Sequence, residues 1–228
     1  MFVHRTELRV GDGQVEVAFT DASTDLTVPA DLARVAADLG VDELRVMHQV
    51  HGRTVVGLDE ALPLGSTPDD AGLPDADAIV IDRPGAATAR AADCVPVALV
   101  DLEAPRAAVV HSGRVGLVAG VVPAAVEALR RGGSATLRAY VGPRACGQCY
   151  EVPQQMTDDV AAVAPAARST TSWGTPALDV GAGVIEQLQA AGVEVVDLGG
   201  CTIEDESLHS YRRQGDESGR QGVVVVVR

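Results

Sequence analysis

Two histidines and one cysteine carry the most specific chemistry in this sequence. His51 follows a stretch that is expected to form a strand. Cys94 directly precedes the apolar run Val95–Asp101, and His111 lies near the end of the run Ala107–Ser112. If these two runs pair as a hairpin, the start of one lies beside the end of the other, so Cys94 faces His111. The pattern predicts one shared site for the three side chains.

One thiolate and two imidazoles are a ligand set that suits Zn²⁺ and leaves a fourth position for water. In such a site the pKa of the bound water falls to about 7, so hydroxide is available at neutral pH. Without a metal, Cys94 and His111 can act as a nucleophile and its base. In the alternative interpretation the three residues have no catalytic or metal-binding role, and the chain has a buried cysteine and two surface histidines. Cysteine is among the most buried residue types, which favours this alternative.

A second group of cysteines follows later in the chain. The segment Cys146-Gly147-Gln148-Cys149 is a C-x-x-C motif, which is typical of metal sites and redox pairs. One interpretation is a structural zinc site that also includes Cys201 and His209. Buried free thiols are the other, and the presence of a single C-x-x-C motif favours them. The zinc nucleobase-deaminase signature also requires H-x-E, which none of the five histidines provides, so the fold of those deaminases is excluded.

Arginines gather near the C-terminus of a chain whose 18 basic residues are all arginine. The guanidinium groups of Arg212, Arg213 and Arg220 match the geometry of phosphate or carboxylate, which predicts an anion site. Arg114, close to His111 in the sequence, is a further candidate. Internal ion pairs are the alternative, formed with Asp205, Glu206, Asp216 and Glu217. Two of the scarce aromatic residues can stack on a purine or simply fill the core, namely Tyr150 and Trp173.

The charge of the chain limits its partners. A net charge of −14 repels phosphate backbones and anionic lipid, so we expect neither nucleic acid nor a membrane surface as a partner. Apolar runs such as Val223–Val227 are far shorter than the roughly 20 residues of a membrane-spanning helix. With no apolar signal segment near Met1, the four cysteines are expected to be reduced. We expect a cytoplasmic protein, either a monomer or a small homo-oligomer.

These residues need a scaffold of strands and helices to position them. Strands are predicted at Thr6–Val10, Gln14–Thr20, Leu44–Gln49, Ala78–Asp82, Val95–Asp101, Ala107–Ser112, Ala135–Val141, Glu194–Asp197 and Val223–Val227. Helices are predicted at Pro29–Leu39, Val121–Arg131, Met156–Ala164 and Ala182–Ala191. Continuous apolar runs indicate strands that are buried on both faces. The pattern predicts a single α/β domain over 1–228, with a mixed β-sheet core and helices packed on both sides. The Pro- and Gly-rich stretch Asp59–Asp77 predicts one long surface loop.

Taken together, the motifs resemble those of the YfiH-like family, also called laccase-domain or multicopper polyphenol oxidase proteins. The family's three metal-site motifs are similar to Gln49-Val50-His51-Gly52, Ala92-Asp93-Cys94-Val95-Pro96-Val97 and Val110-His111-Ser112-Gly113. Its later landmarks follow in the family's order, as Gly142-Pro143, Cys149-Tyr150-Glu151-Val152, Cys201-Thr202, Ser210-Tyr211-Arg212-Arg213 and Gly219-Arg220. The resemblance covers the chain from about Arg45 to the C-terminus.

The resemblance implies the YfiH-like fold and a zinc-dependent purine nucleoside phosphorylase that also deaminates adenosine and cleaves methylthioadenosine. Phosphate would attack the anomeric carbon of the ribose as the base leaves. It implies Cys94 and His111 as zinc ligands, with His51 as third ligand or as acid and base. Asp93 and Gln49 would orient the ligands without binding the metal themselves. The implied partners are a small purine nucleoside and phosphate.

The chain departs from the family pattern near the substrate. The family has an arginine where Asp21 stands in this sequence. Its His-Ala-Gly-Trp-Arg-Gly motif becomes His111-Ser112-Gly113-Arg114-Val115-Gly116, in which Arg114 can replace the lost charge. The resemblance therefore covers the metal site more fully than the phosphate site.

Three other functions compete with the nucleoside enzyme. Two histidines and one cysteine also form a blue-copper ligand set, which is the basis for a copper polyphenol oxidase. Oxygen reduction needs further coppers, however, and the five histidines are too few to hold them. A paralogue that binds metal or nucleoside without turnover is favoured by Asp21. A metal-free cysteine hydrolase would rest on the Cys94 and His111 pair.

Overall fold

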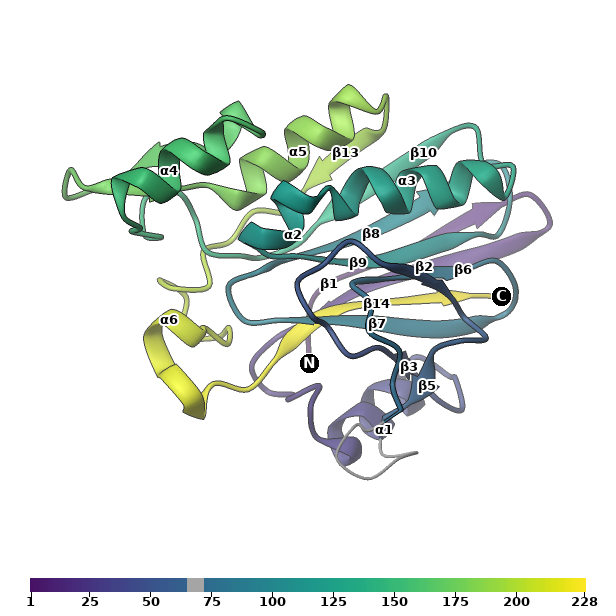
Figure 1. The fold of residues 1–228 in the computed structure, drawn as a ribbon. Helices are drawn as coiled ribbons and strands as arrows, with labels where there is room; N and C mark the ends of the chain where they lie inside the picture. The colour runs from purple at the N-terminus through teal and green to yellow at the C-terminus, as the bar shows by residue number, and fades with distance from the viewer. Residues whose placement is uncertain (65–71) are drawn as a thin grey trace.

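Two six-stranded β-sheets pack face to face in the computed structural model, which describes residues 1–64 and 72–228 (Figure 1). The first sheet has the order β1-β2-β14-β7-β3-β5 and the second has the order β13-β10-β8-β9-β6-β4. The strands of the first sheet are β1 (Phe2–Val10), β2 (Gly13–Thr20), β14 (Gln221–Val227), β7 (Gly85–Ala91), β3 (Arg45–Val46) and β5 (Leu62–Pro63). Those of the second are β13 (Glu194–Asp197), β10 (Leu137–Val141), β8 (Val95–Asp101), β9 (Ala107–Ser112), β6 (Ala78–Ile81) and β4 (Val55–Gly57). Each sheet combines parallel and antiparallel pairs.

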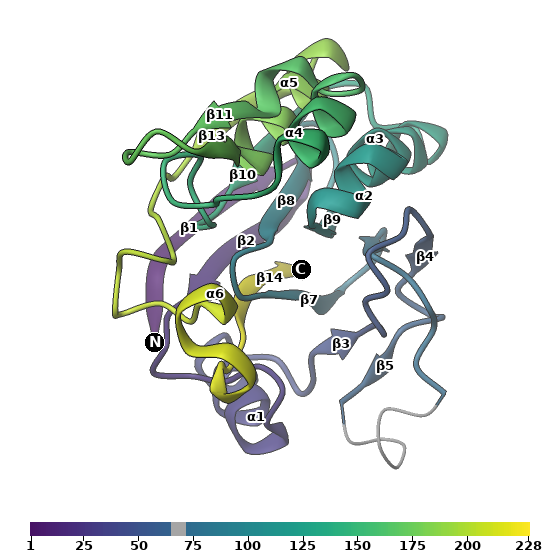
Figure 2. The ribbon, with the colours of Figure 1, turned by 60° about the vertical axis from the view of Figure 1, so that its left-hand side comes forward.

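Helices cover the outer face of each sheet. In two views, α3, α4 and α5 lie on one side of the sheets and α1 lies on the opposite side (Figure 1, Figure 2). The helices are α1 (Pro29–Asp38), α2 (Arg114–Ala119), α3 (Val121–Arg131), α4 (Gln154–Ala161), α5 (Val180–Ala190) and the short α6 (Tyr211–Gln214). Smaller elements are the strand pair β11 (Arg168–Thr170) and β12 (Pro176–Leu178) and the 3₁₀ turns Pro165–Ala167 and Gly215–Glu217. Within the described ranges, no helix is long and apolar enough to cross a bilayer.

Alternating side chains fill three apolar layers. In β14, Val223, Val225 and Val227 pack between the two sheets, whereas Val224 and Val226 pack toward α1. Strand β8 alternates in the same way between the inter-sheet core and the layer under α3 and α5. These valine-rich runs are therefore buried on both faces, as their continuous apolar sequences predicted. The predicted mixed α/β class with helices on both sides is confirmed, and its core consists of two sheets.

Most predicted elements are present, and the exceptions have physical causes. The bounds of β8, β9, β13 and α3 agree with those predicted. The strand predicted at Leu44–Gln49 is reduced to Arg45–Val46, and β7 was not predicted. The sequence of β7 is GAATARA, in which small residues replace the β-branched residues that usually mark a strand. Its position between β14 and β3 gives it hydrogen-bonding partners on both sides.

The long surface loop predicted at Asp59–Asp77 is confirmed as mostly irregular in the parts that the structure describes, but it is neither continuous nor fully exposed. Leu62–Pro63 forms β5 against β3, and Asp75 pairs with His48 in an isolated bridge. Asp77 is fully buried rather than exposed on a loop. Residues 65–71 of the predicted loop lie outside the described residues.

Candidate metal centre and substrate cavity

The predicted hairpin brings Cys94 and His111 together, and the segment after β3 adds His51. Strands β8 and β9 pair in antiparallel register with Pro96 opposite His111, so Cys94, just before β8, lies near the end of β9. The ligand atoms of His51, Cys94 and His111 all lie within 4.8 Å of one another. Cys94 Sγ is 3.8 Å from His51 Nε2, and the two imidazole rings meet edge to face with centroids 4.8 Å apart.

Asp77 orients two of the three candidate ligands. Its fully buried carboxylate accepts hydrogen bonds from His111 Nδ1 at 2.8 Å, from the His51 backbone N–H at 3.0 Å and from the Gly52 backbone N–H at 2.6 Å. The bond to Nδ1 leaves Nε2 of His111 available to the cluster. A carboxylate behind a histidine is the usual support of a metal ligand. Sequence reasoning missed Asp77, because its place depends on the pairing of β6 with β9, which puts Ala78 opposite Val110.

Two strained backbone positions occur at the candidate ligands, one at His51 itself and one at Asp93, directly before Cys94. His51 has φ of 59° and Asp93 has φ of 85°, and among the described residues no other non-glycine residue has positive φ. Such a conformation costs on the order of 1–3 kcal/mol and persists where the surroundings enforce it. The Asp93 carboxylate accepts hydrogen bonds from Thr202 Oγ1 at 2.6 Å and from the Arg212 backbone N–H at 2.7 Å. Asp93 thus ties the Cys94 turn to the C-terminal segment and does not contact the histidines.

Gly113 makes room for the cluster. A Cβ atom at this position would lie 2.8 Å from His51 Cδ2 and 2.9 Å from Cys94 Sγ, closer than real Cβ contacts. Only glycine allows the start of α2 to approach both ligands. The local backbone is therefore shaped to leave space around the sulfur and the imidazole.

The buried groups of the cluster perturb one another's pKa values. Burial raises the pKa of the Cys94 thiol, but the charge of His111 and hydrogen bonds from His111 and His51 outweigh it and lower the pKa to about 6. Burial lowers the pKa of His111, but the Cys94 thiolate and the hydrogen bond to Asp77 outweigh it and raise the pKa to about 9. Both shifts favour a thiolate paired with an imidazolium when no metal is bound. The thiolate is the form of cysteine that binds metals and attacks electrophiles.

A cavity of about 850 Å³ surrounds the cluster, within the range of about 300–1,000 Å³ that is usual for small-molecule sites. Most of the predicted site residues line it, namely Gln49, His51, Asp93, Cys94, His111, Arg114, Arg212 and Arg220. Other lining residues are Thr27, His48, Arg90, Ala91, Ala92, Gly113, Ala145, Tyr150, Val180 and Tyr211. The cavity thus combines the candidate metal ligands with several guanidinium groups and two phenol rings.

The C-terminal arginines have different partners. The Arg212 guanidinium lies over the Tyr150 ring at 5.0 Å, and that of Arg220 lies 5.8 Å from the Tyr211 ring. Arg213 does not line the cavity, because its guanidinium donates to the backbone carbonyls of Thr202, Ile203, Asp205 and Leu208. Within the described part of the chain, no ion pair joins the side chains of these three arginines to an acidic residue.

Gln49 fixes the segment that carries His51. Its side-chain amide donates to the Arg90 carbonyl and accepts from the Arg90 N–H, both at 2.8 Å. Arg90 Nη2 in turn donates to the Met47 carbonyl at 3.0 Å. This exchange attaches the His51 loop to the end of β7. Arg90 also lines the cavity, and it was missed because β7 was not predicted.

The remaining residues considered from the sequence have other partners. His48 lines the cavity, and its ring pairs with the exposed Asp75 at 2.7 Å. The exposed Trp173 donates to Glu151 at 2.7 Å and does not line the cavity. The ring of His209 is 3.1 Å from the carbonyl of Thr24 and is not part of a cysteine cluster, contrary to the zinc site considered from the sequence.

Comparisons with known proteins identify the family of this chain. Residues 13–228 match the family described as multi-copper polyphenol oxidoreductase laccase. The chain is 49% identical over 192 residues to a purine nucleoside phosphorylase of Streptomyces coelicolor, and the match covers 82% of this chain and 77% of that relative. It is 32% identical over 206 residues to an adenosine deaminase of an unknown prokaryotic organism, and that match covers 82% of this chain and 76% of that relative. The hypothetical protein YfiH of Bacillus licheniformis has the same fold, with a TM-score of 0.83 at 24% identity over 94% of this chain and 93% of that one. The motif resemblance is thereby confirmed, and the chain belongs to the multi-copper polyphenol oxidoreductase laccase family.

Proposed function

We propose that this protein is a zinc-dependent purine nucleoside phosphorylase that also deaminates adenosine and cleaves methylthioadenosine. The observation that carries the proposal is the cluster of His51, Cys94 and His111 inside a cavity lined by arginine and tyrosine side chains. Relatives named purine nucleoside phosphorylase and adenosine deaminase support an enzyme that acts on nucleosides.

The donor set favours one zinc ion over a group of coppers. One thiolate and two imidazoles fit tetrahedral zinc with one position open. A multicopper oxidase needs several more histidines. Of the other three, His4 packs against Phe19 and Tyr140, His48 pairs with Asp75, and His209 contacts the backbone of Thr24. We therefore propose no copper-oxidase activity for this chain, although the family is named after one.

In this proposal the arginines hold the anionic substrate. Arg114 and Arg212 lie on the cavity wall, and no acidic residue in the described ranges is ion-paired with either of them. Their planar guanidinium groups can bind phosphate with two hydrogen bonds each. Phosphate held there would attack the anomeric carbon of the ribose while the bond from that carbon to the base nitrogen breaks. Tyr150 and Tyr211 offer aromatic faces to the purine.

The metal site supplies the electrophilic part of the chemistry. Zinc held by His51, Cys94 and His111 would supply Lewis-acid chemistry at this end of the cavity. Asp77 keeps His111 in the tautomer that presents Nε2, and Gly113 keeps the space around Cys94 open. His51 is exposed at the cavity and either completes the ligand set or transfers the proton to the departing base.

A metal-free cysteine hydrolase is the second candidate, because His111 lowers the pKa of Cys94 to about 6. Such a thiolate is a nucleophile at neutral pH without any metal. Chelation separates the two proposals. The zinc enzyme loses turnover with a chelator and regains it with Zn²⁺, whereas the cysteine hydrolase keeps turnover in chelator and loses it on alkylation.

The test is a panel of adenosine, inosine and methylthioadenosine, each with and without phosphate, with products separated by chromatography. Zinc is quantified in the same samples. We expect phosphate-dependent release of free base by wild type, and loss of both zinc and turnover in Cys94→Ala. Arg131→Ala on the exposed face of α3 is the control for Arg114→Ala. Bound zinc without any change in the nucleosides would favour the binding paralogue.

A further inference from the structure

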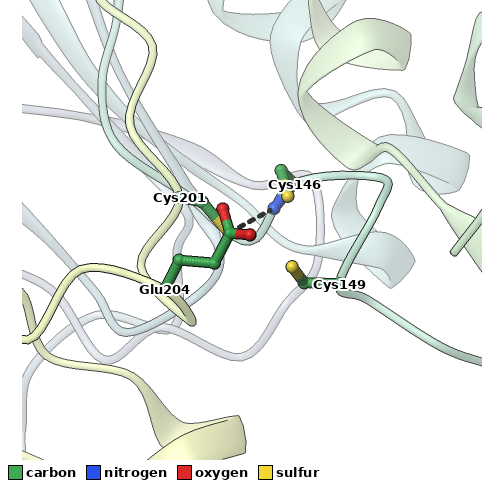
Figure 3. Close-up of side chains that lie close together, drawn as sticks. All are labelled: Cys146, Cys149, Cys201 and Glu204. Carbon is green, nitrogen blue, oxygen red and sulfur yellow. Dashed lines mark hydrogen bonds between the residues drawn. The ribbon is translucent and has the colours of Figure 1, made fainter. Parts of the chain in front are cut away.

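A second cluster of ligating side chains lies apart from the cavity. The ligand atoms of Cys146, Cys149, Cys201 and Glu204 all lie within 4.8 Å of one another (Figure 3). None of the four residues lines the cavity, and none belongs to the His51 cluster. The three cysteines are half-buried and Glu204 is exposed, so an ion can reach the cluster from solvent.

Two tight turns present these four side chains. In the first turn the backbone N–H groups of Cys149 and Tyr150 donate to the carbonyl of Cys146 at 3.1 and 3.0 Å. In the second, the N–H groups of Glu204 and Asp205 donate to the carbonyl of Cys201 at 3.2 and 3.0 Å. Each turn therefore carries two ligands three residues apart. The chain has a C-x-x-C pair and a C-x-x-E pair in place of the two C-x-x-C pairs of common zinc sites.

Backbone pairing holds the two turns side by side. Arg144 N–H donates to the Gly200 carbonyl at 3.1 Å, and Thr202 N–H donates to the Arg144 carbonyl at 3.0 Å. Arg144 and Cys201 thus form a parallel bridge, two residues before the first cysteine of the C-x-x-C pair. The Cys146 N–H points at Cys201 Sγ at 3.4 Å (Figure 3), and a donor in this position stabilises a thiolate. The site is pre-arranged without a metal.

The cluster lacks a compensating positive charge among its own members. Three thiols and the carboxyl group of Glu204 place their ligand atoms within 4.8 Å of one another. Four acidic groups that crowd together in this way repel one another when ionised. A divalent cation would reverse that repulsion, because thiolates and a carboxylate are good zinc ligands.

We propose that Cys146, Cys149, Cys201 and Glu204 bind a structural divalent ion of the zinc class. In tetrahedral coordination with Zn–S bonds of about 2.3 Å, sulfur atoms lie about 3.8 Å apart. The cluster therefore needs to contract by about 1 Å at most from its limit of 4.8 Å. With four protein ligands the site is closed, which is the mark of a structural site. Three thiolates exclude Mg²⁺ and Ca²⁺, which prefer oxygen.

Such an ion would fasten one wall of the cavity. Ala145 and Tyr150, on either side of the C-x-x-C pair, both line the cavity. On the other turn, Thr202 donates to Asp93, whose second oxygen accepts from the Arg212 N–H. The ion therefore joins the segment of Tyr150 to the segment that supports Arg212. Its role is positioning, since no ligand of this second site faces the cavity.

The experiment uses the full chain with Cys94→Ala, which removes the first site. The protein is incubated with Zn²⁺, desalted and measured for zinc, and for free thiols after unfolding. We expect about two zinc ions per chain for wild type and one for Cys94→Ala. Adding Cys149→Ser should remove the remaining ion, and adding Glu204→Gln should weaken it by about tenfold or more in competition with a chelator. Glu206→Gln, a nearby exposed glutamate, should bind zinc like its parent.

Cobalt provides a readout that is independent of activity. Co²⁺ bound by three thiolates gives a stronger sulfur-to-metal charge-transfer band than Co²⁺ bound by one thiolate, so Cys94→Ala should retain most of the band. A folded Cys94→Ala protein that binds neither Zn²⁺ nor Co²⁺ would overturn the proposal. A measured protein mass lower by two hydrogens, with cysteines that resist alkylation, would also overturn it, because that result indicates a disulfide. If Cys149→Ser does not fold, Glu204→Gln and its control decide the question. Inactivity toward nucleosides would not affect any of these results.

Discussion

Replacing Asp77 by asparagine changes only the second oxygen of the carboxylate and its charge, yet it acts on two candidate ligands. Oδ1 accepts from His111 Nδ1 and from the His51 N–H, and Oδ2 accepts from the Gly52 N–H. If asparagine keeps its oxygen at the Oδ1 position, its amide N–H₂ faces the Gly52 N–H. If the amide flips, the bonds to His111 and His51 are lost instead.

The first orientation costs less, and its cost can be worked out from the contacts. The half-buried backbone N–H of Gly52 loses its acceptor and meets another donor, which costs about 1–3 kcal/mol. The loss of the negative charge also makes His111 a poorer ligand, because a neutral amide supports the imidazole less than a carboxylate. Substitution of a residue that hydrogen-bonds to a metal-bound histidine weakens metal binding by about 10–100-fold. We expect Asp77→Asn to reduce zinc affinity at the His51 cluster by that amount.

The assay is zinc competition against a chromophoric chelator, with the unfolding free energy measured in urea and chelator to separate folding from binding. Glu204→Gln serves as the common background, so that the first site dominates the signal. Asp75→Asn is the matched control, because Asp75 also pairs with a histidine but is exposed and lies outside the cluster. Equal zinc affinity for folded Asp77→Asn and for Asp75→Asn would refute the role given to Asp77.

Three further predictions follow from the geometry of the cavity. Gly113→Ala puts a Cβ atom 2.8 Å from His51 Cδ2 and 2.9 Å from Cys94 Sγ, so we expect lower zinc occupancy at this site in metal analysis. We also expect the free energy of unfolding in urea to fall by about 1–3 kcal/mol. Full zinc occupancy would contradict the steric argument. In metal-free protein, the rate of Cys94 alkylation should rise with pH around a midpoint near 6, because the thiolate forms above its lowered pKa, and a midpoint near 9 would show that His111 does not stabilise it. Arg212→Ala should raise KM for phosphate by about tenfold, the loss of one charge-assisted contact, without changing zinc content; kinetics that match those of Arg131→Ala would remove Arg212 from the phosphate site.

The parts of the site that depend on local sequence could be predicted. The runs that form β8 and β9 are short, apolar and bounded by turn residues, which allowed a hairpin hypothesis that places Cys94 beside His111, and the observed register agrees with it. Asp77 could not be found in this way, because β6 reaches β9 only through tertiary pairing and Asp77 follows a Pro- and Gly-rich stretch. Arg90 was missed for a related reason, since the alanines of β7 gave no strand signal.

The sequence pattern also could not predict that the core contains two sheets rather than one. Continuous valine runs indicate burial on both faces of a strand, but they do not say whether a helix or a second sheet covers each face. In this chain one face of β14 meets the other sheet and the opposite face meets α1. Glu204 was overlooked because it is one exposed acid in an acidic segment. Its position beside the C-x-x-C motif depends on the long-range bridge between Arg144 and Cys201.

The most direct test of the central claim is the detection of ribose 1-phosphate by phosphorus NMR after zinc-loaded protein is mixed with inosine and phosphate. The wild-type protein should produce ribose 1-phosphate and free base in equal amounts, and Cys94→Ala should produce neither. Equal production by the two proteins, or release of free base without any sugar phosphate, would contradict a phosphorylase that depends on the His51, Cys94 and His111 cluster.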